Sequence, residues 1–327
     1  MQSEVMSNSV DKPYLDLCSK IDFSPIFIMG QHRSGTTLLY QNLVATECFN
    51  CVRAYHIIRY DEILSNYINQ TENQVRQELE KVFKSLGISD RMIDSVVPTP
   101  DLPEEYGFIL KNAGYQFYLN PENLSLFIEL CKKIQFISNP NLPLLLKNPW
   151  CFSHFKYVKD TFPKAKFIFI HRHPIHVINS TLKAVRLLFY TKSAYTTLID
   201  KKYSKIWNNL LKKLCYRFLY SNYLDIGLHQ VTKSSVESTT YFLENINSLS
   251  KTDYISLGYE ELCQSPESTI LKILNFLGLQ AKAVLEYDKL IKKRQIQLLP
   301  EVSRKYTKIC HNLEPYLNYF GYDIKLE

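Results

Sequence analysis

Short apolar runs alternate with longer segments of helical spacing along this chain. Four runs have the apolar character of strands buried on both faces, and they are Pro25–Gly30, Pro143–Lys147, Lys166–Ile170 and Tyr254–Leu257. Helical spacing follows the first run from Thr36, the second near 151–162 and the third as far as about Tyr190. Strands that alternate with helices predict an α/β domain of three layers, in which helices flank a central parallel sheet.

Two further segments, 61–95 and 196–250, have a largely helical pattern. In the second segment, apolar residues recur on one helix face and predict a stripe that packs on the core: Trp207, Leu210, Leu211, Leu214 and Phe218. Prolines predict loops at Thr99–Pro103 and Asn139–Pro143. Residues 1–24 form a polar lead-in, and the absence of a repeat or linker predicts one domain over 25–327.

Composition and charge narrow the class of protein. Hydrophobic residues make up 46% of the chain and charged residues 22%, and the net charge of +7 is too small and dispersed to predict nucleic-acid binding. The N-terminus lacks the regions of a signal peptide, and no apolar run approaches the ~18 residues of a membrane span. We expect a soluble, cytoplasmic protein without a transmembrane segment, with export by a dedicated machinery left open. The oligomeric state is not predicted.

Cysteine spacing gives little sign of metal or redox chemistry. Of eight cysteines, only Cys48 and Cys51 form a CxxC pair, and no second pair completes a zinc site. We expect reduced thiols.

The segment Gly30–Gly35 keeps the GxxxxG frame of a phosphate-binding loop between a strand and a helix. Its glycines let successive N–H groups face an anion, and the helix that begins near Thr36 adds the positive end of its dipole. Thr36 stands where an ATPase has the Walker lysine, and Arg33 lies inside the loop instead. A guanidinium is suited to forked contact with phosphate or sulfate oxygens. The fold predicted is therefore of the P-loop type.

The run PIFIMGQHRSGTTLL resembles the 5′-phosphosulfate-binding loop of sulfotransferases that use 3′-phosphoadenosine-5′-phosphosulfate (PAPS), and its RSGTT form is similar to that of tyrosylprotein sulfotransferases and bacterial relatives. The resemblance implies a single sulfotransferase domain over 25–327. It also implies that Arg33, Ser34, Gly35, Thr36 and Thr37 bind the nucleotide.

A second element resembles the family's 3′-phosphate site. A strand leads to Arg172, Pro174 suits the first turn of a helix, and Ser180 lies eight residues after the arginine. An arginine fork and a serine hydroxyl are suited to one phosphate. Because the carboxyl ends of parallel strands meet at one edge, we expect Gly30, Lys147 and Arg172 to converge.

The resemblance extends to the C-terminal part of the chain. Tyr259, in the sequence YEEL, is similar to the family tyrosine near the nucleotide. The segment with Arg304 and Lys305 resembles the basic segment that closes over the nucleotide, and 317–323 resembles the terminal segment.

Candidate catalytic residues follow from the chemistry of sulfuryl transfer, an in-line displacement that needs cations for the developing charge and a base for a hydroxyl acceptor. Arg33 is one cation, and Lys147 resembles the family lysine that reaches the bridging oxygen. The base stays open between Glu105 and Glu104, in a PEE segment common in bacterial relatives, and His56, near where tyrosylprotein sulfotransferases have a glutamate. The missing glutamate argues against strict protein-tyrosine activity.

Two alternative functions stay open: a P-loop nucleotide kinase or NTPase, and a non-catalytic protein that binds PAPS or phosphate. His171, His173 and His176 lie close in sequence, but without a nearby carboxylate or cysteine they predict no metal site. We expect PAPS as the donor, no metal, and a hydroxyl or amine on a small-molecule, lipid or glycan acceptor.

Overall fold

Five strands form one parallel sheet in the order β2-β3-β1-β4-β5. The computed structural model describes residues 9–94, 96–283 and 297–323. Its strands are β1 (Pro25–Met29), β2 (Asn50–Cys51), β3 (Leu144–Lys147), β4 (Lys166–His171) and β5 (Tyr254–Gly258). The first half contains helices α1 (Thr36–Ala45), α2 (Ala54–Ile58), α3 (Ile63–Ile68), α4 (Glu72–Ser85), α5 (Gly107–Asn112), α6 (Leu124–Ile137) and α7 (Phe155–Thr161).

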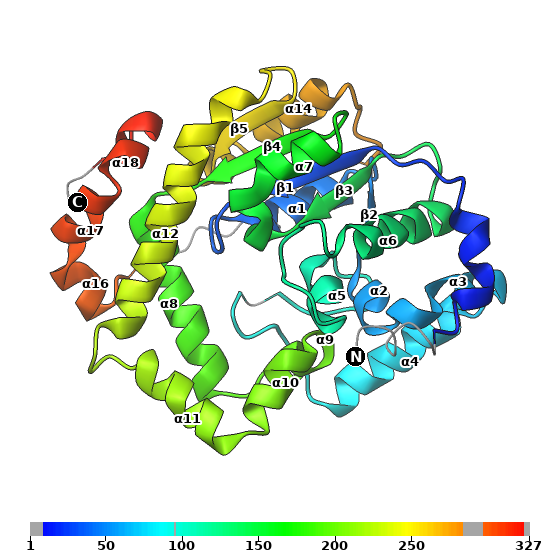
Figure 1. Cartoon of the computed structure of the whole chain (residues 1–327), viewed down its shortest axis with the longest axis horizontal. Coiled ribbons are helices and arrows are strands. Elements are labelled where there is room, and N and C mark those ends of the chain that lie inside the picture. The colour runs from blue at the N-terminus through cyan, green and yellow to red at the C-terminus, as the bar shows by residue number, and fades with distance from the viewer. Residues whose placement is uncertain (1–8, 95, 284–296, 324–327) are drawn as a thin grey trace.

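The second half of the chain is mostly helical (Figure 1). Its helices are α8 (Pro174–Tyr190), α9 (Ala194–Ile199), α10 (Lys201–Trp207), α11 (Leu210–Leu219), α12 (Ile226–Asn245), α13 (Tyr259–Gln264), α14 (Pro266–Leu277), α16 (Pro300–Arg304), α17 (Tyr306–Asn312) and α18 (Glu314–Phe320). Short 3₁₀ helices are η1 (Lys12–Cys18), η2 (Tyr60–Glu62), η3 (Pro149–His154) and η4 (Ile246–Ser248). No described helix is long and apolar enough to cross a bilayer.

Side chains of the central strand alternate between two apolar layers. Ile26 and Ile28 of β1 pack with residues of α1 and α14, whereas Phe27 and Met29 pack with residues of α6, α7 and α12. Helices thus cover both faces of the sheet, as Figure 1 shows. The predicted three-layer α/β architecture is confirmed.

Most predicted elements are confirmed, and two are wrong. Helix α1 begins at Thr36 and α8 ends at Tyr190 as expected, and the proline-rich stretches are loops. The helical prediction for 61–95 is wrong beyond Ser85, where α4 ends and a loop begins. The core-facing stripe is also wrong. Its last four residues lie on α11, where no residue is buried, whereas Trp207 lies on α10, is partly buried and donates from its indole N–H to the Leu188 carbonyl at 3.0 Å.

The described part of the lead-in packs on the domain. Asp11 is fully buried, accepts a hydrogen bond from the Ser65 N–H at 2.9 Å and pairs with Lys133 Nζ at 3.0 Å. Lys133 lies on α6 and is only 1% exposed, so this ion pair is inside the protein. Through these two contacts, Asp11 attaches the lead-in to α3 and α6.

None of the eight cysteines, all of which lie in the described part of the chain, forms a disulfide, and Cys48 and Cys51 are both buried. Cys51 lies in β2, a short edge strand that sequence analysis did not find. The Cys48 thiol donates to the carbonyl of Gln280 at 3.0 Å.

Candidate active site

The loop between β1 and α1 turns sharply because two of its residues are left-handed. Arg33 has φ +69° and Gly35 has φ +102°. The Ser34 N–H donates to the Gln31 carbonyl at 3.1 Å and closes the turn. A Cβ on Gly35 would lie 2.3 Å from the Tyr259 ring, so only glycine fits between the loop and α13. The first turn of α1 consequently directs its unpaired N–H groups into the loop.

Polar side chains of this loop are buried but incompletely paired. The hydroxyl of Ser34 has no hydrogen-bond partner among the described residues. Thr36 is also buried, and the Thr37 hydroxyl accepts a hydrogen bond from Lys147 Nζ at 2.8 Å. A buried unpaired donor is costly, and a bound anion would satisfy it.

The second predicted anion element lies directly against the first. Ser180 of α8 accepts a hydrogen bond from Arg33 Nε at 3.1 Å, and Arg172, just after β4, donates to the Arg33 carbonyl at 3.1 Å. The Arg172 guanidinium lies 4.2 Å from the centre of the Tyr259 ring, a cation–π contact. Its Nε is buried without a hydrogen-bond partner among the described residues. The predicted convergence of the two elements is present in the structure.

Lys147 and Glu105 form a buried ion pair beside the loop. Lys147 ends β3, is fully buried, and places Nζ 2.8 Å from Glu105 Oε1. Burial alone would raise the pKa of Glu105, but the Lys147 ammonium, with smaller contributions from His32 and Arg91, holds the pKa below its ordinary value. Glu105 is therefore a carboxylate at neutral pH, next to the loop residue Thr37.

His32 belongs to the same cluster, although sequence analysis did not single it out. Its ring packs edge-on against Trp150 with the centroids 4.4 Å apart, and Nε2 is buried without a hydrogen-bond partner among the described residues. Burial lowers the pKa of His32 to about 4, against an opposing effect of Glu105. The only sequence signal for His32 is its place next to Arg33 in the loop.

We expect His32 to stay neutral through the physiological range. In NMR titrations, its ring resonance, assigned with His32→Asn, should shift with a midpoint at about 4. Because the unfolded chain binds this proton near pH ~6.5, burial of His32 should reduce the free energy of unfolding as the pH falls from there toward 4. A midpoint near the free imidazole value would contradict the buried position.

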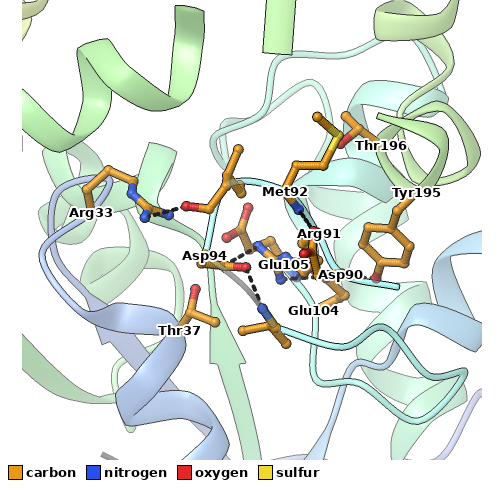
Figure 2. A network of polar contacts seen from close by, with 12 residues as sticks. Arg33, Thr37, Asp90, Arg91, Met92, Asp94, Glu104, Glu105, Tyr195 and Thr196 are labelled. Carbon is orange, nitrogen blue, oxygen red and sulfur yellow. Dashed lines mark hydrogen bonds and ion pairs between the residues drawn. The ribbon is translucent and has the colours of Figure 1, made fainter. Parts of the chain in front are cut away.

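Glu104 and Glu105 face different surroundings despite being adjacent. Glu104 is fully buried and accepts hydrogen bonds from Arg91 Nη1 at 2.8 Å and from the Tyr195 hydroxyl at 2.7 Å (Figure 2). Burial raises the pKa of Glu104, in opposition to Arg91. Arg91 lies in the loop that follows α4, and in that loop the carbonyl of Ile93 accepts a hydrogen bond from Arg33 Nη2 at 2.9 Å. Glu104 thus fixes a loop that contacts Arg33.

His56 lies apart from the Lys147 cluster. It is buried in α2, and its Nδ1 accepts a hydrogen bond from the Arg53 N–H at 3.0 Å, which caps that helix. Burial holds the pKa of His56 well below its ordinary value. Within the described chain, His56 has no contact with Lys147 or Glu105.

The basic segment near the C-terminus is also apart from the loop. Arg304 Nη2 lies 3.4 Å from Asp225, and Lys305 pairs with the same carboxylate. The lysine–carboxylate hydrogen bond lowers the pKa of Asp225. The structure thus pairs Arg304 and Lys305 with the start of α12.

The three clustered histidines have separate environments. The His171 ring lies 2.6 Å from the Tyr316 hydroxyl inside the protein, and the rings of His173 and His176 are 5.0 Å apart near the start of α8. Residues 9–94, 96–283 and 297–323 contain no group of three His, Cys, Asp or Glu residues arranged to hold a metal. The expectation of metal-free chemistry stays a prediction.

The fold and the site define a P-loop-type protein in which the two predicted anion elements contact each other and the Walker lysine position holds Thr36. A model described as the sulfotransferase family matches residues 25–283, and the chain belongs to this family. The chain is 26% identical over 273 residues to the omega-hydroxy-beta-dihydromenaquinone-9 sulfotransferases Stf3 of Mycobacterium bovis and Mycobacterium tuberculosis. These matches cover 78% of this chain and 63% of the relatives, less than two thirds of their length.

Solved structures share the fold at low sequence identity. Sulfotransferase STF9 from Mycobacterium avium superposes with a TM-score of 0.62 at 14% identity, covering 96% of this chain and 80% of that one. Sulfotransferase STF1 from Mycobacterium tuberculosis superposes with a TM-score of 0.57 at 13% identity, covering 94% and 80%. The predicted fold class and family are confirmed.

Proposed function

We propose that this protein transfers the sulfuryl group of PAPS to a hydroxyl group of an acceptor. The observation that carries the proposal is the direct contact of the two anion elements, Arg33 with Ser180 and Arg172 with the Arg33 carbonyl. Two linked phosphate sites suit a nucleotide with phosphate at both its 5′ and 3′ positions. The buried donors without partners, the Ser34 hydroxyl and Arg172 Nε, fit such a polyanion.

The residues of each element suit one end of the donor. The loop N–H groups and hydroxyls from Ser34 to Thr37, with the dipole of α1, would hold the 5′-phosphosulfate. Arg172 and Ser180 would hold the 3′-phosphate, and Tyr259 offers an aromatic face beside Arg172. Arg304 and Lys305 would join the site only if they left Asp225, so we propose them as a segment that closes on the bound nucleotide.

Lys147 and Glu105 are the proposed catalytic pair. In the transfer, the sulfur–oxygen bond to the 5′-phosphate breaks and a bond from sulfur to the acceptor oxygen forms. Lys147, with Arg33, would stabilise the charge on the departing phosphate, and the Glu105 carboxylate would take the acceptor proton. Glu104 and His56 are positioning residues in this proposal, since Glu104 holds Arg91 and His56 caps α2.

For the acceptor we propose a hydroxyl-bearing lipid. The named mycobacterial relatives act on a modified menaquinone, a lipid, according to their names. Phenolic, polyketide-like and glycan alcohols are the alternatives. Because the described cysteines form no disulfide, we propose a cytoplasmic location, where thiols stay reduced.

Calorimetry with adenosine 3′,5′-bisphosphate and with ATP tests the donor site. We expect the bisphosphate to bind more tightly, and Arg172→Ala to weaken its binding by about 10–100-fold, since hydrogen bonds to charged groups contribute ~1.5–3 kcal/mol each. Arg33→Ala should weaken binding as well. Arg59→Ala is the matched control, because Arg59 pairs with Glu62 at the surface and contacts neither element.

Preference for ATP would favour the nucleotide kinase or NTPase. Desulfation of PAPS in the presence of a mixed acceptor pool separates an enzyme from a protein that only binds the nucleotide. Tight binding of the bisphosphate without any turnover would favour the binding protein.

A further inference from the structure

Helix α11 presents its apolar face to solvent. Leu210, Leu211, Leu214 and Phe218, which we call the α11 face, are spaced to lie on one side of the helix. They are exposed by 62%, 79%, 48% and 60%, respectively. Figure 1 shows α11 at the rim of the molecule, far from the sheet. No described element covers this face.

Other residues of α11, Tyr216 and Arg217, make the contacts with the rest of the protein. The Tyr216 ring stacks on Phe189 of α8 with the centroids 4.5 Å apart. Arg217 donates to the carbonyls of Phe189 at 2.7 Å and Tyr190 at 3.0 Å. A surface helix of a globular protein normally packs with its apolar side, and α11 is inverted. The outward orientation is therefore fixed by specific contacts and leaves the apolar side available to a partner.

The segment around this face is strongly basic. Between Asp200 and Asp225 the chain has no acidic residue, and its basic residues are Lys201, Lys202, Lys205, Lys212, Lys213 and Arg217. The carboxylates at the two ends of this segment do not neutralise its basic residues, because Asp200 pairs with Lys111 and Asp225 pairs with Lys305. Four of the lysines, at 201, 202, 205 and 212, are exposed.

More exposed apolar residues follow in the chain directly after α11. Tyr223 is 90% exposed, Leu224 40% and Ile226 43%. Large apolar side chains gathered in this way on a protein surface mark an interaction site. The basic residues of the same segment favour an anionic partner.

We propose that the α11 face binds peripherally to the surface of an anionic lipid bilayer. Apolar residues on one side of a short helix enter the boundary between headgroups and acyl chains, and neighbouring lysines attract anionic headgroups by ~1 kcal/mol each. Ten residues span only ~15 Å, so the helix lies on the bilayer and does not cross it. A second copy of the chain is a poorer partner, because the basic segments of the two copies would repel each other.

The position of α11 links this contact to the active site. Helix α8 carries Ser180, which contacts Arg33, and nine residues further on Phe189, which contacts Tyr216 of α11. That separation is ~14 Å along the helix axis. A bilayer at the α11 face would thus lie beside the helix that carries part of the proposed donor site, an inference that rests on the proposed function.

Co-sedimentation with lipid vesicles tests the proposal on the full chain. We expect binding to phosphatidylcholine vesicles with roughly 30% phosphatidylglycerol, weaker binding in about 0.5 M NaCl, and weaker binding to phosphatidylcholine alone. The double variant Leu211→Glu, Phe218→Glu should reduce binding by about tenfold or more. Leu271→Glu on α14 is the matched control, since Leu271 is an exposed leucine outside the segment and should leave binding unchanged.

Two outcomes would overturn the proposal. One is equal vesicle binding by the wild type and the double variant. The other is a wild type that does not bind vesicles but forms a dimer that the double variant abolishes, which would assign the α11 face to a second copy. Calorimetry with adenosine 3′,5′-bisphosphate on the same samples should be unaffected by the double variant, so a failed donor site is distinguished from a failed membrane contact.

Discussion

Replacement of Lys147 by methionine should lower the turnover number of sulfuryl transfer by about 10²–10³-fold. The change keeps a side chain of similar length. In the proposed mechanism it removes a preorganised cation from the place where charge develops on the leaving phosphate, and losses of that order are found in other enzymes. Adenosine 3′,5′-bisphosphate should still bind, because Arg172 and Ser180 are intact. Steady-state kinetics and calorimetry on the same samples measure both effects.

A second variant separates chemistry from folding. Lys147→Met alone leaves the buried Glu105 carboxylate without its ion-pair partner, which lowers the free energy of unfolding. The double variant Lys147→Met, Glu105→Gln replaces the ion pair by a neutral pair and should recover much of the stability without recovering turnover. Glu105→Gln alone should spare nucleotide binding and slow transfer. Normal turnover in the double variant would remove both residues from the proposed mechanism.

Replacement of Glu104 by alanine should lower the free energy of unfolding by about 3–5 kcal/mol. Removal of one partner of a buried ion pair typically has a penalty of this size, because the other charge loses its compensation. Arg91, only 7% exposed, would keep only the Asp94 carboxylate, 3.3 Å away, and the Tyr195 hydroxyl would lose its acceptor as well. Urea denaturation followed by circular dichroism measures the difference.

A double-mutant cycle tests whether this loss of stability comes from the pairing of Glu104 with Arg91. The variant Arg91→Met, Glu104→Leu removes both charges and should cost less than the sum of the single changes. Loss of less than about 1 kcal/mol in Glu104→Ala would show that the pair does not fix the loop after α4.

Much of the candidate site was predictable from the arrangement of a parallel sheet, in which all strands point the same way. Apolar runs located β1, β3, β4 and β5, and their carboxyl ends had to meet at one edge of the sheet. The contact of Arg33 with Ser180, across 147 positions of sequence, follows from that rule combined with the two phosphate motifs.

What the sequence could not predict depends on contacts between distant segments. Glu104 and Glu105 are equivalent in a PEE motif, and their surroundings differ only because Arg91, 13 residues earlier in the same connection between α4 and α5, pairs with Glu104, whereas Lys147 of β3 pairs with Glu105. His32 matches no sequence motif that would have identified it as a site residue. Strand β2 is two residues long, too short for a periodic signal.

The orientation of α11 was mispredicted for a related reason. Periodicity shows that a helix has an apolar side, but it does not show whether that side is covered. Here Tyr216 and Arg217 contact α8, and the four apolar residues of the α11 face are exposed.

The buried pairing of Asp11 with Lys133 bears on how this protein is handled in the laboratory. A truncated version that starts at the first strand would lack Asp11. The buried Lys133 ammonium would then keep only one of its two carboxylate partners, Glu129. Expression clones should therefore retain the residues from Asp11 onward, and affinity tags at this end need a spacer that does not pull the segment off its helices.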